Sequence, residues 1–205
     1  MKKILIRSFS VILLGGLLVF LVLKYVRPNP LNDPEARVRF EENAGDAKSF
    51  LISHPEYNQD FVFLVDMAVK SRYHRFFVYN VKSDIIEEKG LVAHGIGSET
   101  GTYGELEFGN TEGSNKTSLG NYRIGNSYTG RFGKSYKLHG LDATNSNAFS
   151  RYIVLHTFAF MPHEEQLVPV MRSEGCPMVS TDFFKILEKR IDASPKPVLM
   201  RIYYK

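Results

Sequence analysis

The run Tyr152-Ile-Val-Leu-His156 decides how the chain is interpreted, because three aliphatic residues stand between an aromatic residue and a histidine. Branched aliphatic and aromatic side chains in so short a run favour a buried β-strand, here expected to reach Phe158. Similar runs recur between turn residues at Phe61 to Asp66, Arg75 to Val81, Ile85 to His94, Ser118 to Ile124, Ser135 to Leu138 and Val198 to Tyr204. The sequence therefore predicts a mainly β fold.

Two other segments carry helix signals. The first helix should begin at Asp33-Pro34, with the aspartate as its cap, and continue to about Ser53 with a break near Gly45. The second should begin at Ser180 or Thr181. The apolar face of this second helix consists of Phe183, Phe184, Leu187 and Ile191. Only a few short helices are therefore expected beside the strands.

Glycine is concentrated in one part of the chain. The stretch from Glu99 to Gly133 holds eight of the 16 glycines. Because glycine supplies turn conformations, we expect long loops around short strands there. Such loops are the usual place for a surface that faces a substrate.

The positive charge lies at the N-terminal end of the chain. The formal net charge is +4, and five of the 26 lysines and arginines precede residue 28, whereas the first acidic residue is Asp33. Residues 28–205 carry the other 21 cations and all 22 acids, so the globular part is close to neutral. This balance excludes a basic surface for DNA or RNA, and no nucleic-acid partner is expected.

An apolar segment of 16 uncharged residues lies between Arg7 and Lys24. Roughly 20 residues span a bilayer, and the segment reaches that length if the two flanking cations extend to the membrane surfaces. No small-x-small site follows, which favours an uncleaved signal anchor over a cleaved signal peptide or a buried core helix. We expect a transmembrane helix over residues 1–27, a linker and short helical region over 28–58, and an exported domain over 59–205.

The single cysteine, Cys176, is informative in an exported chain, because oxidising compartments normally use cysteines in pairs. One interpretation is a small buried hydrophobe. The turn Gly175-Cys176-Pro177 favours a functional thiol, since its pre-set backbone presents the sulfur from a loop. A nucleophilic thiol needs a base, and a partly ionised thiolate–imidazolium pair would hold the thiol pKa below its usual value.

Six histidines compete for the role of base. His156 stands at the end of the run quoted above, 20 residues before Cys176, where a rigid strand delivers its side chain. Three others fit solvated or loop positions better: His54, His74 and His163. A histidine at a strand end is more often structural when taken alone, whereas the Gly-Cys-Pro turn favours a catalytic His156.

These residues together resemble a known family. Arg151-x-Ile-Val-x-His156 followed by Arg172-Ser-x-Gly-Cys-Pro177 is similar to the L,D-transpeptidases, in particular to murein L,D-transpeptidase catalytic domains. Further similar segments are Val65-Asp66, Arg75-Phe-Phe-Val-Tyr79, Val92-Ala-His-Gly95, Phe108-x-Asn110, Thr117-Ser-Leu-Gly-x-Tyr122, Tyr128-x-Gly130, Leu138-His-Gly-Leu141 and Asn145-x-Asn-Ala148. The resemblance covers about residues 60 to 204.

The resemblance implies a β-sandwich or barrel and a peptidoglycan L,D-transpeptidase that uses no cofactor. Cys176 would attack the carbonyl of the third stem residue, release D-alanine and form 3-3 cross-links. His156 would act as base with its ring steered by the Thr157 carbonyl, and the N–H groups of Gly175 and Cys176 would form an oxyanion hole. Its partners would be peptidoglycan stem peptides and, through the N-terminal helix, the inner membrane of a bacterial envelope, with the catalytic domain in the periplasm.

Substrate contacts are expected at four residues: Arg172, Ser173, His139 and His94. Arg172 could bind a substrate carboxylate or support its own loop. His94 could anchor a loop or contact the substrate, and His139 would line the pocket. The chain departs from the family pattern at Glu174, where many members carry histidine, and at Met178, where an arginine often stands.

Other functions remain open beside transpeptidation. A murein L,D-carboxypeptidase would share the acylation step and let water resolve the thioester. A non-catalytic, membrane-tethered peptidoglycan-binding module is favoured by Glu174, whose charge would raise the thiol pKa if it faced the sulfur. A metal site could use four residues: His94, His139, His156 or Cys176. No metal is expected, because the sequence has no short ligand pair such as Cys-x-x-Cys.

Overall fold

The computed structural model describes residues 30–102 and 104–205. The strands are β1 (Phe61–Asp66), β2 (Phe76–Asn80), β3 (Ile85–Gly90), β4 (Gly120–Gly130), β5 (Gly133–Gly140), β6 (Val154–Thr157), β7 (Met178–Val179) and β8 (Leu199–Tyr203). The α-helices are α2 (Pro34–Ser53) and α3 (Thr181–Ala193), and the 3-10 helices are η1 (Pro30–Asn32) and η2 (Ile96–Ser98). The expected transmembrane helix, residues 1–27, lies outside the described residues. Within them, none of the helices has the length and apolar character needed to cross a bilayer.

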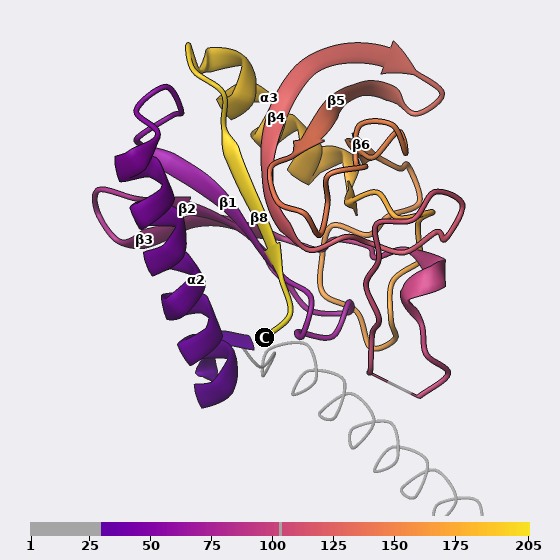
Figure 1. Cartoon of the computed structure of the whole chain (residues 1–205). Helices are drawn as coiled ribbons and strands as arrows, with labels where there is room; N and C mark the ends of the chain where they lie inside the picture. The colour runs from indigo at the N-terminus through magenta and orange to yellow at the C-terminus, as the bar shows by residue number, and fades with distance from the viewer. Residues whose placement is uncertain (1–29, 103) are drawn as a thin grey trace, which may run out of the picture.

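All eight strands belong to one mixed sheet in the order β3-β2-β1-β8-β4-β5-β6-β7 (Figure 1). The mainly β prediction is therefore confirmed, although hydrogen bonds join the strands in a single sheet and not in two stacked ones. The two edges of this sheet also meet at one point, because Val92, just after β3, forms a bridge with Val179 of β7. The N–H of Ala93 donates to the Met178 carbonyl over 2.9 Å. The sheet thus rolls toward a barrel.

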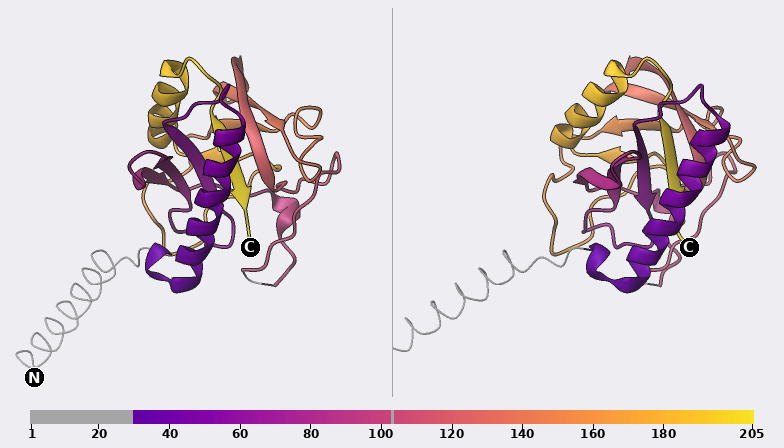
Figure 2. Two further views of the ribbon diagram at one scale, coloured as in Figure 1. Left: turned by 60° about the vertical axis from the view of Figure 1, so that its left-hand side comes forward. Right: turned by 90° about the vertical axis from the view of Figure 1, so that its left-hand side faces the viewer.

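Both faces of the centre of the sheet are buried, which explains the continuous apolar run of β1. Val62 and Leu64 belong to the cluster that packs under α2. Phe63 and Val65, which point to the other face, belong to the larger cluster that includes Phe183 of α3. In Figure 2, α2 runs alongside the strands at this part of the sheet. Burial on both faces makes this the most strongly packed part of the sheet.

Helix α2 begins as expected, because the Asp33 side chain accepts a hydrogen bond from the Glu35 N–H and Pro34 is the first helical residue. The expected break near Gly45 is wrong, since the helix is continuous. Gly45 faces solvent, whereas Ala44 and other residues around it are buried against the sheet. Tertiary packing therefore outweighs the cost of about 1 kcal/mol that a helical glycine carries.

The glycine-rich stretch contains the longest strand, which corrects the expectation of short strands there. β4 has 11 residues, and its partner β5 follows after the two-residue turn Arg131-Phe132. Gly125 lies under the ring of His139, where an added Cβ would come within 2.5 Å of Nε2. This glycine therefore permits close packing inside a strand. The two-residue strand β7 was not predicted at all, because two residues carry no alternation.

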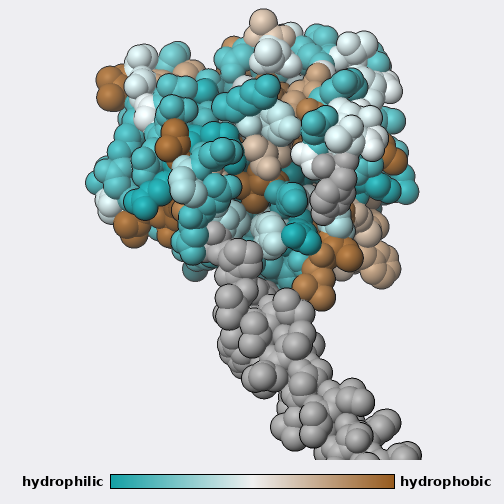
Figure 3. All heavy atoms as spheres, turned by 90° about the horizontal axis from the view of Figure 1, so that it is seen from below, coloured by the Kyte–Doolittle hydropathy of each residue, from teal (hydrophilic) through white to brown (hydrophobic). Residues whose placement is uncertain are grey.

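The surface seen from below is mainly hydrophilic, and its hydrophobic residues form small separate patches (Figure 3). Such scattered patches are ordinary for a soluble domain surface. On this face, candidate binding features must therefore be sought in cavities and polar clusters.

Candidate active site

The residue expected as base lies on β6, and the residue expected as nucleophile lies two residues before its parallel partner β7. His156 stands opposite Met178 in this pairing, and its backbone N–H donates to the Pro177 carbonyl over 3.4 Å. Cys176 comes directly before Pro177, at the entrance to β7. The β6–β7 pairing thus places the segment that follows Cys176 beside His156, which the sequence spacing alone did not show.

The ring of His156 is held in one tautomer. Its Nδ1 lies 2.9 Å from the carbonyl oxygen of Thr157. A carbonyl can only accept, so Nδ1 carries the proton of the neutral ring and Nε2 is left as the basic atom. Burial lowers the pKa of His156, and the bond to Thr157 opposes that shift. The ring also stacks on Phe132, with 4.5 Å between centroids and 24° between planes.

The thiol of Cys176 is bonded to backbone groups of the chain just before His156. Its Sγ accepts a hydrogen bond from the Val154 N–H at 3.4 Å and donates to the Tyr152 carbonyl at 3.8 Å. Burial raises the pKa of the thiol, and the smaller effects of the Val154 N–H and the Arg151 charge lower it. Burial thus favours the neutral thiol over the thiolate–imidazolium pair expected from the sequence, and the Tyr152 carbonyl is the acceptor in reach of the S–H group.

Glu174, where many family members carry histidine, raises the pKa of Cys176, which is the direction expected from the sequence. The side chain is exposed, yet its negative charge adds to the rise in the Cys176 pKa, as the smallest of the causes. Arg151 opposes it and also holds the loop beside the turn. Its guanidinium donates to the carbonyls of Gly109 at 3.0 Å and Lys116 at 2.7 Å. Arg151 belongs to a motif singled out in the sequence, although its role was not foreseen.

The turn before the nucleophile is built around Ser173. The Ser173 hydroxyl donates to the Cys176 carbonyl over 2.7 Å and accepts from the Gly175 N–H over 3.2 Å. Gly175 has a φ of +113°, and a Cβ there would lie 2.9 Å from the Lys116 carbonyl. Glycine is therefore required at this position. Ser173 was expected to contact substrate, but its hydroxyl is used within the turn.

Of the two backbone donors expected in the oxyanion hole, one already has an acceptor and the other does not. The Gly175 N–H is bonded to Ser173, as described above. Among residues 30–102 and 104–205, none accepts a hydrogen bond from the Cys176 N–H. The N–H of Cys176 is thus the donor that can meet a ligand oxygen without first losing a partner.

A residue with a left-handed backbone accepts the hydrogen bond of the Cys176 thiol. Tyr152 has a φ of +59°, in the left-handed region, although its side chain is 82% exposed. Its N–H donates to the Phe149 carbonyl and the Ile153 N–H donates to the Ala148 carbonyl. These two bonds are those of a Schellman motif, whose left-handed position usually holds glycine. The motif directs the Tyr152 carbonyl at the thiol.

The remaining expected substrate-binding histidine on β5 lies apart from the pair. The ring of His139 stacks on Phe149 at 4.8 Å between centroids and covers Gly125. It makes no hydrogen bond with Cys176 or His156, all three being described residues. The structure therefore does not bring His139 into the catalytic pair.

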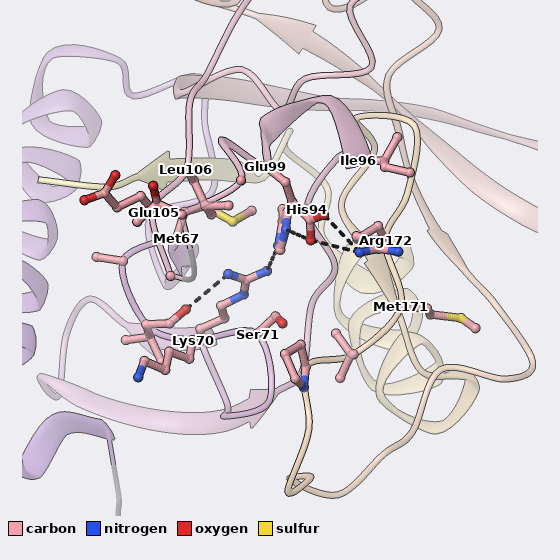
Figure 4. Close-up of a pocket in the computed structure, with 18 residues that line it drawn as sticks. Met67, Lys70, Ser71, His94, Ile96, Glu99, Glu105, Leu106, Met171 and Arg172 are labelled. Carbon is pink, nitrogen blue, oxygen red and sulfur yellow. Dashed lines mark hydrogen bonds and ion pairs between the residues drawn. The ribbon is translucent and has the colours of Figure 1, made fainter.

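His94 and Arg172 line a separate cavity of about 790 Å³ (Figure 4). Cys176 and His156 are not among its lining residues. The cavity and the nucleophile turn share one wall, because the Ser173 N–H donates to the His94 carbonyl over 2.9 Å. Two further residues of this cavity, Arg75 and Glu99, were not assigned a site role from the sequence.

Arg75 is 1% exposed and Glu99 pairs with Arg172. An arginine at the start of a predicted buried strand is a signal that could have drawn attention to Arg75. No sequence feature marks Glu99. Within the described residues, no group of three or more histidine, cysteine, aspartate or glutamate side chains is arranged to hold a metal ion.

Comparison with known proteins agrees with the resemblance stated from the motifs. The family model described as L,D-transpeptidase catalytic domain matches residues 38–197. Comparison with curated protein sequences gives no significant match.

Among solved structures, the chain is similar to the helical cell shape determining protein Pgp2 from Campylobacter jejuni, with 12% identity and a TM-score of 0.47 over 77% of this chain and 55% of that one. It is also similar to Bd1075 from Bdellovibrio bacteriovorus, with 19% identity and a TM-score of 0.40 over 69% and 48% of the two chains. A third is the L,D-transpeptidase from Xylanimonas cellulosilytica DSM 15894, with 14% identity and a TM-score of 0.40 over 71% and 61%. The chain thus spans between 48% and 61% of the length of these solved chains.

Proposed function

The chain belongs to the L,D-transpeptidase catalytic-domain family, and from this premise we propose that it is a peptidoglycan L,D-transpeptidase with Cys176 as nucleophile. The observation that carries the proposal is the pairing of β6 with β7. This pairing puts a histidine with an unprotonated Nε2 on the strand next to the cysteine. The unpaired N–H of Cys176 supports the same role.

In the proposed acylation, Sγ of Cys176 attacks the carbonyl carbon of the third stem residue. The thiol proton passes to Nε2 of His156, and the carbonyl oxygen gains charge beside the Cys176 N–H. The C–N bond to the terminal D-alanine then breaks, and His156 returns the proton to the leaving amine. A side-chain amine of a second stem attacks the thioester, forms the new amide and restores the thiol.

The hydrogen bond that the Cys176 thiol makes at rest has to be exchanged before acylation can begin. The thiol donates to the Tyr152 carbonyl at rest, so its S–H bond has to rotate from that carbonyl to Nε2 of His156 when substrate arrives. A thiol with a raised pKa and a histidine with a lowered pKa favour the neutral pair. His156 therefore acts as a general base during the attack and does not hold a preformed thiolate.

The second candidate is a non-catalytic peptidoglycan-binding module. It is favoured by the raised pKa of Cys176 and by the engagement of the Gly175 N–H with Ser173. In both cases we propose that residues 1–27 anchor the domain to the inner membrane and that the domain faces the periplasm. Recovery of the protein from the soluble envelope fraction, with a new N-terminus near Pro28, would contradict the anchor.

Incubation of the purified domain with murein rich in tetrapeptides tests the reaction. Mass analysis of the products should show cross-linked dimers, and intact-protein mass should show an acyl group that is absent from Cys176→Ala. Tripeptides without dimers would identify a carboxypeptidase. A wild-type protein that is never acylated, yet still sediments with murein, would support the binding module.

A further inference from the structure

The cavity of about 790 Å³ has the size of a ligand site and a wall of mixed character (Figure 4). Its apolar part includes Met67, Ile96, Leu106 and Met171. Its polar part is a chain of three contacts that runs from the protein interior to the surface. These contacts join Arg75 to His94, His94 to Glu99, and Glu99 to Arg172.

The first contact sets the chemistry of His94. A guanidinium N–H of Arg75 donates to Nδ1 of His94 over 3.0 Å. Arginine can only donate, so Nδ1 is the unprotonated atom and Nε2 carries the proton of the neutral ring. His94 is 7% exposed, and its Nε2 has no hydrogen-bond partner among the described residues. A buried N–H without an acceptor destabilises the folded state unless a ligand or a water molecule supplies the acceptor.

The nearest candidate partner is the carboxylate of Glu99, which falls just short. Its Oε1 lies 3.6 Å from Nε2 of His94, beyond hydrogen-bonding distance. The same carboxylate is held by Nη1 of Arg172, at 2.9 and 3.2 Å from its two oxygens. In Figure 4 the carboxylate lies between His94 and Arg172. Arg172 and Glu99 are both partly exposed, so this ion pair is weak in water and can be exchanged.

We propose that the cavity is a carboxylate-binding site in which Glu99 stands in for the ligand. An incoming carboxylate takes the guanidinium of Arg172 from Glu99 and also accepts from Nε2–H of His94, from which the Glu99 carboxylate lies 3.6 Å away. The apolar wall then covers the carbon atoms next to that carboxylate. The assignment of the ligand to a peptide C-terminus rests on the proposed function, whereas the carboxylate site does not.

Two features favour a carboxylate over a larger anion. The donors are one planar guanidinium and one imidazole N–H, which match two oxygens in a plane. The charges of the other lining residues Glu105 and Lys70 are opposite in sign, so beyond Arg172 and Arg75 the lining supplies no further excess of positive charge for a ligand with several negative charges. The fully buried charge of Arg75 adds attraction without contacting the ligand, because its donors bond to the Val92 and Val69 carbonyls and to His94.

The test is made in Cys176→Ser protein, so that binding is measured without acylation. The probe is N-acetyl-D-alanyl-D-alanine, whose only charge is its carboxylate, and the comparison ligand is its C-terminal amide. Calorimetry should show the acid binding at least about tenfold more tightly than the amide. The NMR signal of the His94 Nε2–H should shift with the same saturation curve.

The variants give the sharpest outcome. Glu99→Ala should tighten binding of the acid by about fivefold or more, because the internal competitor is gone, whereas Arg172→Gln should weaken it by about tenfold or more. Glu105→Ala is the matched control. It removes one negative charge from the same cavity without releasing Arg172, and should change the affinity less than about twofold.

Equal affinities for acid and amide, or weaker binding of the acid to Glu99→Ala, would overturn the proposal. The site and the proposed function fail separately. Tight binding of the acid with no acylation of the wild-type protein leaves the carboxylate site and removes the transferase. Acylation of the wild-type protein together with equal binding of acid and amide supports the transferase and contradicts the carboxylate site.

Discussion

The two buried histidines of this domain, His156 and His94, are built as opposites. Both have a pKa lowered mainly by burial, to about 4 for His94, and both are therefore neutral at pH 7. The partner of Nδ1 is a carbonyl in His156 and a guanidinium in His94. The first leaves Nε2 as a base and the second leaves Nε2 as a donor.

The difference shows that a histidine's chemistry is set by the group on its far nitrogen. Both residues end apolar runs in the sequence, so the run itself does not reveal which ring nitrogen carries the proton. The carbonyl of Thr157 comes from the next residue along the chain, so the state of His156 is local. The guanidinium of Arg75 comes from the residue just before β2, 19 residues before His94, so the state of His94 depends on tertiary structure.

The largest expected effect comes from replacing each histidine by glutamine, which can donate a hydrogen bond but cannot act as a base. His156→Gln should lower kcat/KM for acylation by about 10²- to 10⁴-fold, the usual contribution of a general base. His94→Gln should lower it by no more than about tenfold, because the amide N–H can replace Nε2–H. Rates of acyl-enzyme formation, followed by intact-protein mass, measure both. Equal losses in the two variants would contradict the assignment of His156 as a base and His94 as a hydrogen-bond donor.

The next effect is on stability. Arg75→Met leaves the Val92 and Val69 carbonyls and Nδ1 of His94 without their donor, in a fully buried place. The free energy of unfolding should fall by about 3 kcal/mol. Denaturant titration measures this, and ring NMR of His94 should show loss of the fixed Nε2–H tautomer. A variant as stable as the wild type would mean that the guanidinium does not hold this region together.

A smaller effect should appear in the pH profile. Burial lowers the pKa of His156 below 6.5, so the base stays neutral and active at pH values below that point. Phe132→Ala uncovers the ring and should raise the pKa toward 6.5. The acid limb of the kcat/KM profile should then move to higher pH. Phe149→Ala, which uncovers His139, is the control and should leave the limb in place.

The smallest expected effect comes from relieving strain at Tyr152. Because the side chain is largely exposed and the backbone is left-handed, Tyr152→Gly should stabilise the fold by about 0.5–1 kcal/mol. Thermal unfolding measures the change. Acylation should persist, since the thiol bonds to the backbone carbonyl of this residue. A destabilised variant would show that the tyrosine ring contributes packing that its exposure conceals.

Helix caps and the continuous apolar run of β1 allowed element boundaries to be predicted from short stretches of sequence. The caps Asp33 and Ser180 accept hydrogen bonds at the starts of α2 and α3, as their sequence positions indicated. The strand from Phe61 to Asp66 has its predicted ends, because both of its faces are buried and its boundaries are sharp. The continuity of α2 through Gly45 was not predicted, since it depends on packing against the sheet.

The Gly-Cys-Pro turn and the strand-end histidine are the sequence signals that predict Cys176 and His156 as a catalytic pair. In the structure His156 lies on β6 and Cys176 lies two residues before β7, the strand that pairs with β6. The protonated thiol could not be foreseen, because it depends on burial and on the carbonyl of Tyr152. The role of Glu99 depends on a contact with Arg172 across 73 residues of sequence, which no local pattern encodes.

The position of β8 has a consequence for how the domain assembles. This strand, the last in the chain order, lies in the centre of the sheet, parallel to β1 and antiparallel to β4. It is the only strand that joins β1, β2 and β3 to β4, β5, β6 and β7 within the described residues. A nascent chain that has not yet delivered residues 199–203 therefore leaves the facing edges of β1 and β4 open. The native sheet is complete only when these residues pair with β1 and β4, and both pairings are long-range, which is typical of slowly folding topologies.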